Sequence, residues 1–184
     1  MGHQLEFLAA YYNKDLFEER GIAVPTTYEE FLATCEALKG AGVVPVAFGN
    51  AAGWPAFHNF SLYANNMIPA DKLEAMIAGE ESWDSPEVVA AIRPAFSDME
   101  AAGCFNPSVN AVSYDDANAL FSGGMAGMTL TGSWMIRSFQ DSPFETGFFF
   151  LPAPEGGETL PPRARAAATS SRPPPRAPRR PIAS

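Results

Sequence analysis

The sequence predicts an α/β fold in which helices pack on a small, mostly parallel sheet. Residues 26–48 combine a capped helix, two glycines and an apolar run, which is the pattern of a helix followed by a buried strand. Residues 114–139 repeat the order of helix, glycines and strand, and a further helix follows. Short helix-to-strand connections are typical of parallel sheets. With 184 residues, of which 47% are hydrophobic, the chain is large enough to bury a core.

The N-terminal part predicts one ambiguous element and one short helix. Residues 5–12 are apolar and aromatic, so their pattern fits either a strand or the start of a helix. Residues 16–20 predict a short helix that Gly21 ends. Pro25 follows and prevents the helix from continuing, because proline has no backbone N–H to donate.

The next helix has a specific start signal. Thr27 and Glu30 have the spacing of a capping box, in which each side chain bonds to the backbone N–H of the other residue. Thr26 and Glu29 offer the same spacing one residue earlier. Apolar residues then recur at helical spacing until Gly40 ends the helix.

Residues 43–48 predict a buried strand, because they are apolar throughout and rich in β-branched residues. Pro45 within this run is a mild objection to the buried strand, because proline cannot donate to a strand ladder and suits edge positions. Residues 49–53 form a loop of small residues, which is followed by an aromatic residue and Pro55. Proline suits the first turn of a helix, so a helix is expected over residues 56–65.

Two further helices are expected in the middle of the chain. Residues 70–78 predict a short helix that a glycine closes. Either Asp84 or Ser85 is the expected N-cap of a longer helix that begins with a proline. Pro94 is expected to kink this helix. Trp83 precedes it and is expected to pack in the core or against the helix start.

The stretch that organises the rest of the fold comes next. Residues 114–121 predict a helix, which the following Ser-Gly-Gly ends. Residues 126–131 alternate between larger apolar and smaller residues, as a short strand does. The chain then turns, and Ser133 is in position to cap a helix over residues 134–139. Residues 147–151 predict a last strand.

Charge divides the chain into two regions. The net charge is -9, yet residues 1–158 hold all 21 acidic residues and only half of the basic ones. We interpret this region as one α/β unit, and its acidity argues against nucleic acid as a partner. Residues 159–184 are rich in arginine and proline and almost free of large apolar residues, so they are expected to form a disordered tail. Their composition resembles GC-rich coding sequence translated out of frame.

Metal, cofactor and membrane signals are absent from the sequence. Cys35 and Cys104 are interpreted as buried free thiols, with a disulfide in an oxidising compartment as the alternative. No zinc-binding spacing occurs, and no cofactor is predicted. No run approaches the roughly 18 apolar residues of a membrane span, so no membrane insertion is expected. Residues 1–15 lack the basic and long apolar regions of a signal peptide.

Five segments occur in an order that resembles the extracellular solute-binding proteins of carbohydrate ABC importers, the class that includes maltose-binding proteins. Each segment alone is only moderately specific, but all five in the family's order form a strong signature. The resemblance covers about residues 9–157. The segments read YYNKDLFEERGIAVPTTYEEFLATCEALKGAGVVPVAFG, GWPAFH, WDSPEVV, DDANALFSGGMAGMTLTGSW and FFFLPAPEGG.

The resemblance implies a periplasmic-binding-protein-like lobe, one of two α/β lobes joined by a hinge, with a mono- or oligosaccharide in the cleft between them. It also implies a periplasmic or extracellular protein, lipid-anchored or secreted, whose partners are ABC permease subunits. The segments match mostly the second lobe, so the chain is expected to be a fragment that binds sugar weakly by itself. Met125 departs from the family's usual G-K-A-A-M pattern, in which a basic residue stands at this position.

Four residues are the predicted ligand-binding residues. The resemblance implies that Trp134, in the G-x-W turn, stacks on a sugar ring; a core tryptophan is the alternative. Trp54 lies where a loop meets a helix and would line the same cleft. Asn50 offers a donor and an acceptor just past a strand end. His58, one turn beyond Trp54, would donate to a sugar hydroxyl, and a half-buried, satisfied side chain is the alternative.

Catalysis finds no support in the sequence. Neighbouring acidic residues on a helix do not face each other, and the two histidines define no nucleophile arrangement. Asp115 and Asp116 are expected to be helix-start charges, which the helix dipole favours. Two alternatives to a sugar-binding protein remain at this point. One is an enzyme acting on glycosides, which would need two carboxylates across a sugar site. The other is a fragment without function from a frame-shifted gene.

Overall fold

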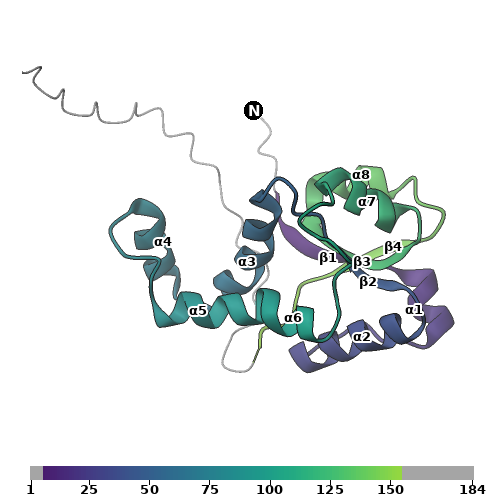
Figure 1. The fold of residues 1–184 in the computed structure, drawn as a ribbon, viewed down its shortest axis with the longest axis horizontal. Helices are drawn as coiled ribbons and strands as arrows, with labels where there is room; N and C mark the ends of the chain where they lie inside the picture. The colour runs from purple at the N-terminus through teal and green to yellow at the C-terminus, as the bar shows by residue number, and fades with distance from the viewer. Residues whose placement is uncertain (1–5, 155–184) are drawn as a thin grey trace, which may run out of the picture.

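A computed structural model of the chain describes residues 6–154. The described part contains a four-stranded sheet with helices on both of its faces (Figure 1). The strands are β1 (Leu8–Asn13), β2 (Val44–Ala47), β3 (Ala126–Gly132) and β4 (Thr146–Phe149). The α-helices are α1 (Lys14–Arg20), α2 (Tyr28–Gly40), α3 (Trp54–Met67), α4 (Ala70–Ala78), α5 (Pro86–Ile92), α6 (Asp98–Ala101), α7 (Tyr114–Ser122) and α8 (Ile136–Phe139).

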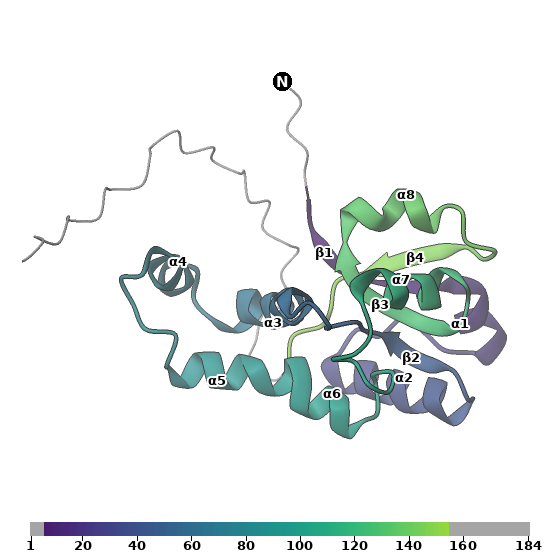
Figure 2. The same cartoon turned by 45° about the horizontal axis from the view of Figure 1, so that its top comes forward.

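The helices form layers on the two faces of the sheet. In both views α1 and α2 lie on one side of the sheet and α7 and α8 on the other (Figures 1 and 2). Helices α3, α5 and α6 extend beside the sheet, and α4 lies at the far end of this extension, away from the strands (Figures 1 and 2). This arrangement confirms the predicted α/β class with helices packed on a small sheet.

The strand directions correct one part of that prediction. The strand order is β2-β3-β1-β4, and only the β2–β3 pair is parallel. Strand β1 runs antiparallel to both β3 and β4, so the sheet is mixed and the prediction of a mostly parallel sheet was wrong. An apolar pattern indicates a strand but carries no direction, because long-range pairing partners decide it. Strand β2, which contains Pro45, stands at one end of this strand order, and Val46 makes an isolated parallel bridge to Phe105.

The capping box is confirmed. The Thr27 hydroxyl accepts a hydrogen bond from the backbone N–H of Glu30 at 3.1 Å, and the Glu30 carboxylate accepts from the N–H of Thr27 at 3.2 Å. The same carboxylate accepts two bonds from Thr26, and these hydrogen bonds hold the pKa of Glu30 below its ordinary value. Helix α2 then buries Phe31 and Leu38 against the sheet.

The expected kink at Pro94 takes the form of one π-helical turn, η1 (Arg93–Ser97), between α5 and α6. A proline ring clashes with the carbonyl four residues earlier and removes one N–H, so the turn widens. Two side chains use the carbonyls of this turn. The Tyr28 hydroxyl donates to the Pro94 carbonyl at 3.0 Å, and the Asn59 amide donates to the Ala95 carbonyl. These bonds attach the turn to α2 and α3.

Cys35 and Cys104 are joined in a disulfide, which corrects the interpretation as free thiols. Both are completely buried in the same hydrophobic cluster, and their Cα atoms are 4.9 Å apart. They are 69 residues apart in the chain, so only the tertiary fold shows that they meet. The bond ties α2 to the segment that follows α6.

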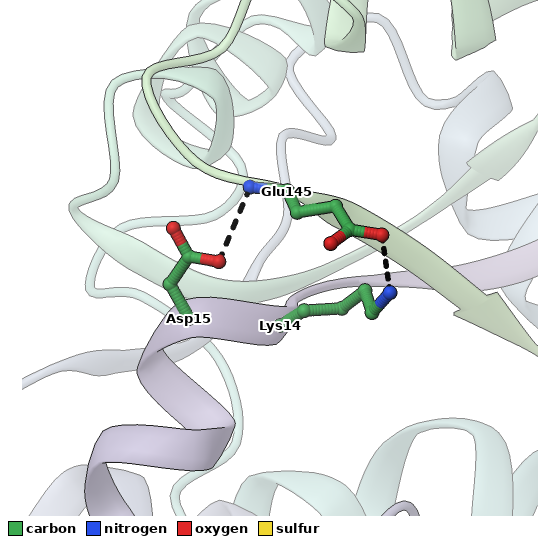
Figure 3. Close-up of polar contacts among 3 residues, drawn as sticks. All are labelled: Lys14, Asp15 and Glu145. Carbon is green, nitrogen blue, oxygen red and sulfur yellow. Dashed lines mark hydrogen bonds and ion pairs between the residues drawn. The ribbon is translucent and has the colours of Figure 1, made fainter.

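The junction of β1 and α1 is fixed to the loop before β4 (Figure 3). Lys14 forms an ion pair with the Glu145 carboxylate, and its backbone N–H donates to the Glu145 carbonyl at 2.9 Å. The Glu145 N–H donates to the Asp15 carboxylate at 3.4 Å. The ion pair is exposed and contributes little to stability. The backbone bond extends the β1–β4 register, in which Asn13 pairs with Thr146.

Two expectations concern membrane insertion and the C-terminal region. Within residues 6–154, none of the helices has the length and apolar character that crossing a bilayer requires. The predicted disordered tail, residues 159–184, and its boundary after residue 158 lie outside the described residues and stay predictions.

Candidate functional site

The candidate site lies where the two parallel strands end. Strand β2 leads into a loop and then α3, and β3 leads directly into a single 3₁₀ turn, η2 (Ser133–Met135). Because neighbouring parallel strands end at the same edge of a sheet, these two connections lie beside each other. The first residue of α3 is Trp54, and the second residue of the 3₁₀ turn is Trp134.

Four rings gather at this edge, and we call them the aromatic cluster: Trp54, His58, Tyr114 and Trp134. The Trp54 ring lies 4.6 Å from the Tyr114 ring and 4.9 Å from the His58 ring, centroid to centroid. The His58 ring lies 5.5 Å from the ring of Trp134. Both indoles stay open to solvent, with 43% of Trp54 and 38% of Trp134 exposed. The structure therefore brings together three of the four predicted ligand residues.

Hydrogen bonds fix the orientation of the Trp134 ring. Its indole N–H donates to the Tyr114 hydroxyl at 2.8 Å, and that hydroxyl is also bonded to the hydroxyl of Thr131, which is fully buried in β3. Because the N–H is used within the protein, the ring meets solvent with carbon atoms of its face and edge. A ring held in this way loses little conformational entropy when a ligand packs on it.

Two glycines allow the backbone to approach the cluster closely. A Cβ atom at Gly132 would overlap the six-membered ring of Trp134, so only glycine lets the indole lie against the end of β3. A Cβ atom at Gly49 would overlap the backbone carbonyl of Ser113, which precedes Tyr114. The site therefore depends on close contact between the end of β2 and the start of α7.

The structure corrects the expected role of Ser133. It was expected to cap the helix after β3, but it makes no cap hydrogen bond there. Its hydroxyl instead accepts from the backbone N–H of Phe7 at 3.2 Å, and its own N–H donates to the Phe7 carbonyl at 2.8 Å. These bonds extend the β1–β3 pairing past Gly132 and hold the turn that carries Trp134.

Asn50, the fourth predicted ligand residue, makes hydrogen bonds within the protein next to the site. Its amide N–H donates to the Asn110 side chain at 2.9 Å, and its carbonyl oxygen accepts from the backbone N–H of Ala56 at 3.0 Å. Its carbonyl oxygen thus holds the first turn of α3, and its NH2 group holds the loop that contains Asn110. Asn50 also lines a separate hollow of about 380 Å³, together with residues that include Phe48, Phe105 and Asn106. The structure does not bring its side chain into the aromatic cluster.

Tyr114 is the residue that sequence reasoning missed. It is the first residue of α7, and Ser113 caps that helix by accepting from the Asp116 N–H at 3.0 Å. Asp115 and Asp116 lie exposed in the first helical turn, as expected of helix-start charges. The available signal was an aromatic residue at a predicted helix start, but 20 residues separate Tyr114 from Trp134, and no periodicity links them.

Burial lowers the pKa of His58 below its ordinary value of 6.5, because desolvation disfavours the imidazolium form. His58 in the folded chain is therefore expected to bind its proton at lower pH than in the unfolded chain. Stability that is present above about pH 6.5 should fall as the pH drops toward the folded-state pKa. An NMR titration of the histidine ring protons measures this, with a His3→Gln variant to assign the signals and urea-unfolded chain as reference. A His58 midpoint at or above that of the unfolded chain would contradict the burial argument.

Among residues 6–154, no group of three or more His, Cys, Asp or Glu side chains is placed to hold a metal ion. The aromatic cluster presents aromatic faces beside the Tyr114 hydroxyl and the His58 imidazole. Such a surface packs against C–H groups and makes a few hydrogen bonds at its margin.

Comparison with known proteins gives a consistent result. The model of the family "Bacterial extracellular solute-binding protein" matches residues 4–173. An uncharacterized ABC transporter extracellular-binding protein of Pyrococcus horikoshii is 31% identical over 150 residues, which cover 79% of this chain and 33% of that protein. The "Multiple sugar-binding protein" of Streptococcus mutans is 28% identical over 156 residues, which cover 82% of this chain and 37% of that protein.

A solved structure from work on xylan utilization by Caldanaerobius polysaccharolyticus superimposes with a TM-score of 0.77 at 26% sequence identity. The superposition covers 83% of this chain and 40% of that chain. The chain thus spans between a third and two fifths of the length of the relatives that it matches. The two curated relatives are similar to this chain in sequence, and the solved structure is also similar in its fold.

Proposed function

The chain belongs to the family of bacterial extracellular solute-binding proteins, and from this we propose that it forms one wall of a carbohydrate-binding cleft. Family membership makes it a binding protein rather than an enzyme, as expected. In this proposal the complete protein captures a mono- or oligosaccharide outside the cytoplasm and presents it to the permease of an ABC importer. The aromatic cluster is the contact surface for the sugar.

The single observation that carries the proposal is the pair of exposed indoles at the carboxyl edge of the β2–β3 pair. A pyranose ring presents C–H groups on its faces and hydroxyl groups around its rim. Aromatic faces pack on the C–H groups, and polar side chains at the margin bond to the hydroxyls. Trp54 and Trp134 supply the faces, and His58 supplies a polar group between them.

The relatives support carbohydrate as the class of solute. One is named a multiple sugar-binding protein, and another was studied in work on xylan utilization. The disulfide between Cys35 and Cys104 supports an extracellular or periplasmic location, because disulfides persist in oxidising compartments.

In the complete protein, closure of two lobes around the sugar would require the sugar to bind the closed state more tightly than the open state.

One wall of a cleft is expected to bind weakly. Sugar hydroxyls that point away from the wall stay solvated, so only part of the ligand surface is desolvated. We expect this chain to bind trisaccharides with dissociation constants in about the millimolar range, which is roughly -4 kcal/mol. A micromolar dissociation constant would contradict the one-wall proposal.

The proposed site is tested with Trp134→Ala. This change removes the ring that the Tyr114 hydroxyl orients, and it should weaken binding of xylotriose or maltotriose by about tenfold. Chemical-shift titration of the ¹⁵N-labelled 184-residue chain measures such weak binding. Phe148→Ala is the matched control, because Phe148 is also an exposed aromatic residue but lies in β4. Equal affinity of wild type and Trp134→Ala for every sugar that binds would exclude Trp134 as the stacking residue.

A further inference from the structure

We propose that the sugar-binding surface continues from the aromatic cluster along α3 to Trp83, so that this wall binds linear oligosaccharides in preference to single sugar units. This inference rests on the proposed function and specifies the class of its ligand. The observations that carry it are the side chains on the solvent side of α3 and a group of aromatic rings along the flank of the same helix.

The solvent side of α3 carries a row of side chains, most of them polar, that a ligand could contact. Residues spaced by three and four along a helix lie on one face, so Trp54, His58, Ser61 and Asn65 form a continuous row. None of these four side chains is buried. The row starts at the aromatic cluster and carries an imidazole, a hydroxyl and an amide in succession; the Ser61 hydroxyl donates to the Phe57 carbonyl at 2.7 Å and keeps its oxygen as an acceptor. These are the groups that form hydrogen bonds with sugar hydroxyls.

A second row of aromatic rings runs beside the first, and we call it the aromatic ledge: Phe57, Phe60 and Trp83. The Phe57 and Phe60 rings are 6.3 Å apart, and the Phe60 and Trp83 rings are 6.4 Å apart, centroid to centroid. Phe57 is 58% exposed and Trp83 is 40% exposed. Trp83, which was expected in the core or against the helix start, therefore contributes an exposed ring at the end of the ledge.

The ledge is held by the helices beside α3. Phe60 packs against the buried cluster that joins α3, α4 and α5, which includes Ala64, Met76 and Val88. Trp83 belongs to the connection between α4 and α5, and both views place α3 between these helices and the sheet (Figures 1 and 2). Phe57 follows Trp54 by three residues, so the ledge begins where the aromatic cluster ends.

The two rows together favour an oligosaccharide as the occupant. A linear oligosaccharide repeats apolar ring faces and polar hydroxyl edges along its length, and here aromatic rings lie along one side and polar groups along the other. A protein partner would require a broader continuous apolar patch, whereas His58 and Ser61 interrupt this one. Nucleic acid is excluded, because the chain carries a net charge of -9 and the rows contain no Lys or Arg. A single sugar unit would occupy the aromatic cluster and leave the ledge unused.

The three indole N–H groups of the chain test the inference directly. Each tryptophan gives one indole signal in a ¹H–¹⁵N spectrum, and the chain has three tryptophans, which Trp→Phe variants assign. The chain is titrated with xylose, xylotriose and xylohexaose, and in parallel with glucose, maltotriose and maltohexaose. In the series that binds, all three lengths should shift the signals of Trp54 and Trp134. Only the longer sugars should shift the signal of Trp83, and affinity should rise at least about fivefold from monosaccharide to hexasaccharide.

Phe57→Ala separates the ledge from the cluster. It should reduce the affinity for the hexasaccharide about fivefold and leave the affinity for the monosaccharide unchanged, while Phe148→Ala changes neither. If the signals of Trp54 and Trp134 respond to sugar but Trp83 does not respond at any length, the inference is wrong and the proposed function stands. If none of the three indoles responds to any sugar, the proposed function itself fails. A Trp83 signal that moves with protein concentration in the absence of sugar would assign the ledge to a second copy of the chain and overturn the inference.

Discussion

Replacing both Cys35 and Cys104 by alanine is expected to lower the free energy of unfolding by about 4 kcal/mol. The cross-link joins residues 69 positions apart, and closing a loop of that size removes conformational entropy from the unfolded chain. For a chain of this length the loss corresponds to a decrease in Tm of about 10 °C. Alanine is preferred to serine, because a hydroxyl in this fully buried cluster would add a desolvation cost.

Urea unfolding in the presence and absence of dithiothreitol measures the contribution of the disulfide. The reductant should shift the wild-type midpoint and leave the double variant unchanged. A thiol assay on denatured wild type should find no free thiol before reduction. Wild-type midpoints that coincide with and without reductant, after complete reduction has been verified, would show that the bond contributes nothing to stability.

Gly49→Ala is expected to cost about 3 kcal/mol and to disturb the aromatic cluster. The added methyl group would overlap the Ser113 carbonyl, a backbone atom that cannot rotate away as a flexible side chain does. The start of α7 must then move, and Tyr114 moves with it. Because the Tyr114 hydroxyl accepts from the indole N–H of Trp134, the orientation of that ring should change as well.

Gly40→Ala is the matched control for this substitution. No atom lies within 4 Å of a Cβ placed at Gly40, the last residue of α2, so the same change should alter stability by less than about 1 kcal/mol. Thermal unfolding and the Trp134 indole signal are measured for both variants. A Gly49→Ala protein with wild-type Tm and an unshifted indole signal would refute the proposed role of this close contact.

Local signals in the sequence predicted most of the elements and their order. The capping box at Thr27 and Glu30, the N-cap at Ser85 and the break at Pro94 all act within one or two helical turns. Such signals can be read from neighbouring residues, because the interacting groups are close in the chain. The strand that contains Pro45 was also predicted, and its place at the end of the strand order agrees with the missing N–H of proline.

The candidate site was predicted only in part. Trp134 was predicted from the family resemblance and Trp54 from the junction of a loop and a helix, and the parallel β2–β3 pair brings both to one edge of the sheet. Tyr114 was missed, and Asn50 was expected to face a ligand although its amide braces α3. Both outcomes depend on which partner a polar group meets after folding, and side-chain type alone does not specify that partner.

The sequence by itself determined the α/β class, the family and the helix boundaries set by caps and prolines. The tertiary structure decided the antiparallel direction of β1, the Cys35–Cys104 disulfide and the bond from Trp134 to Tyr114. The physical reason is the distance along the chain. Caps and turns join residues a few positions apart, whereas these features join residues between 20 and 124 positions apart, from Tyr114 and Trp134 to Leu8 and Gly132, and only the packing of whole elements brings such residues together.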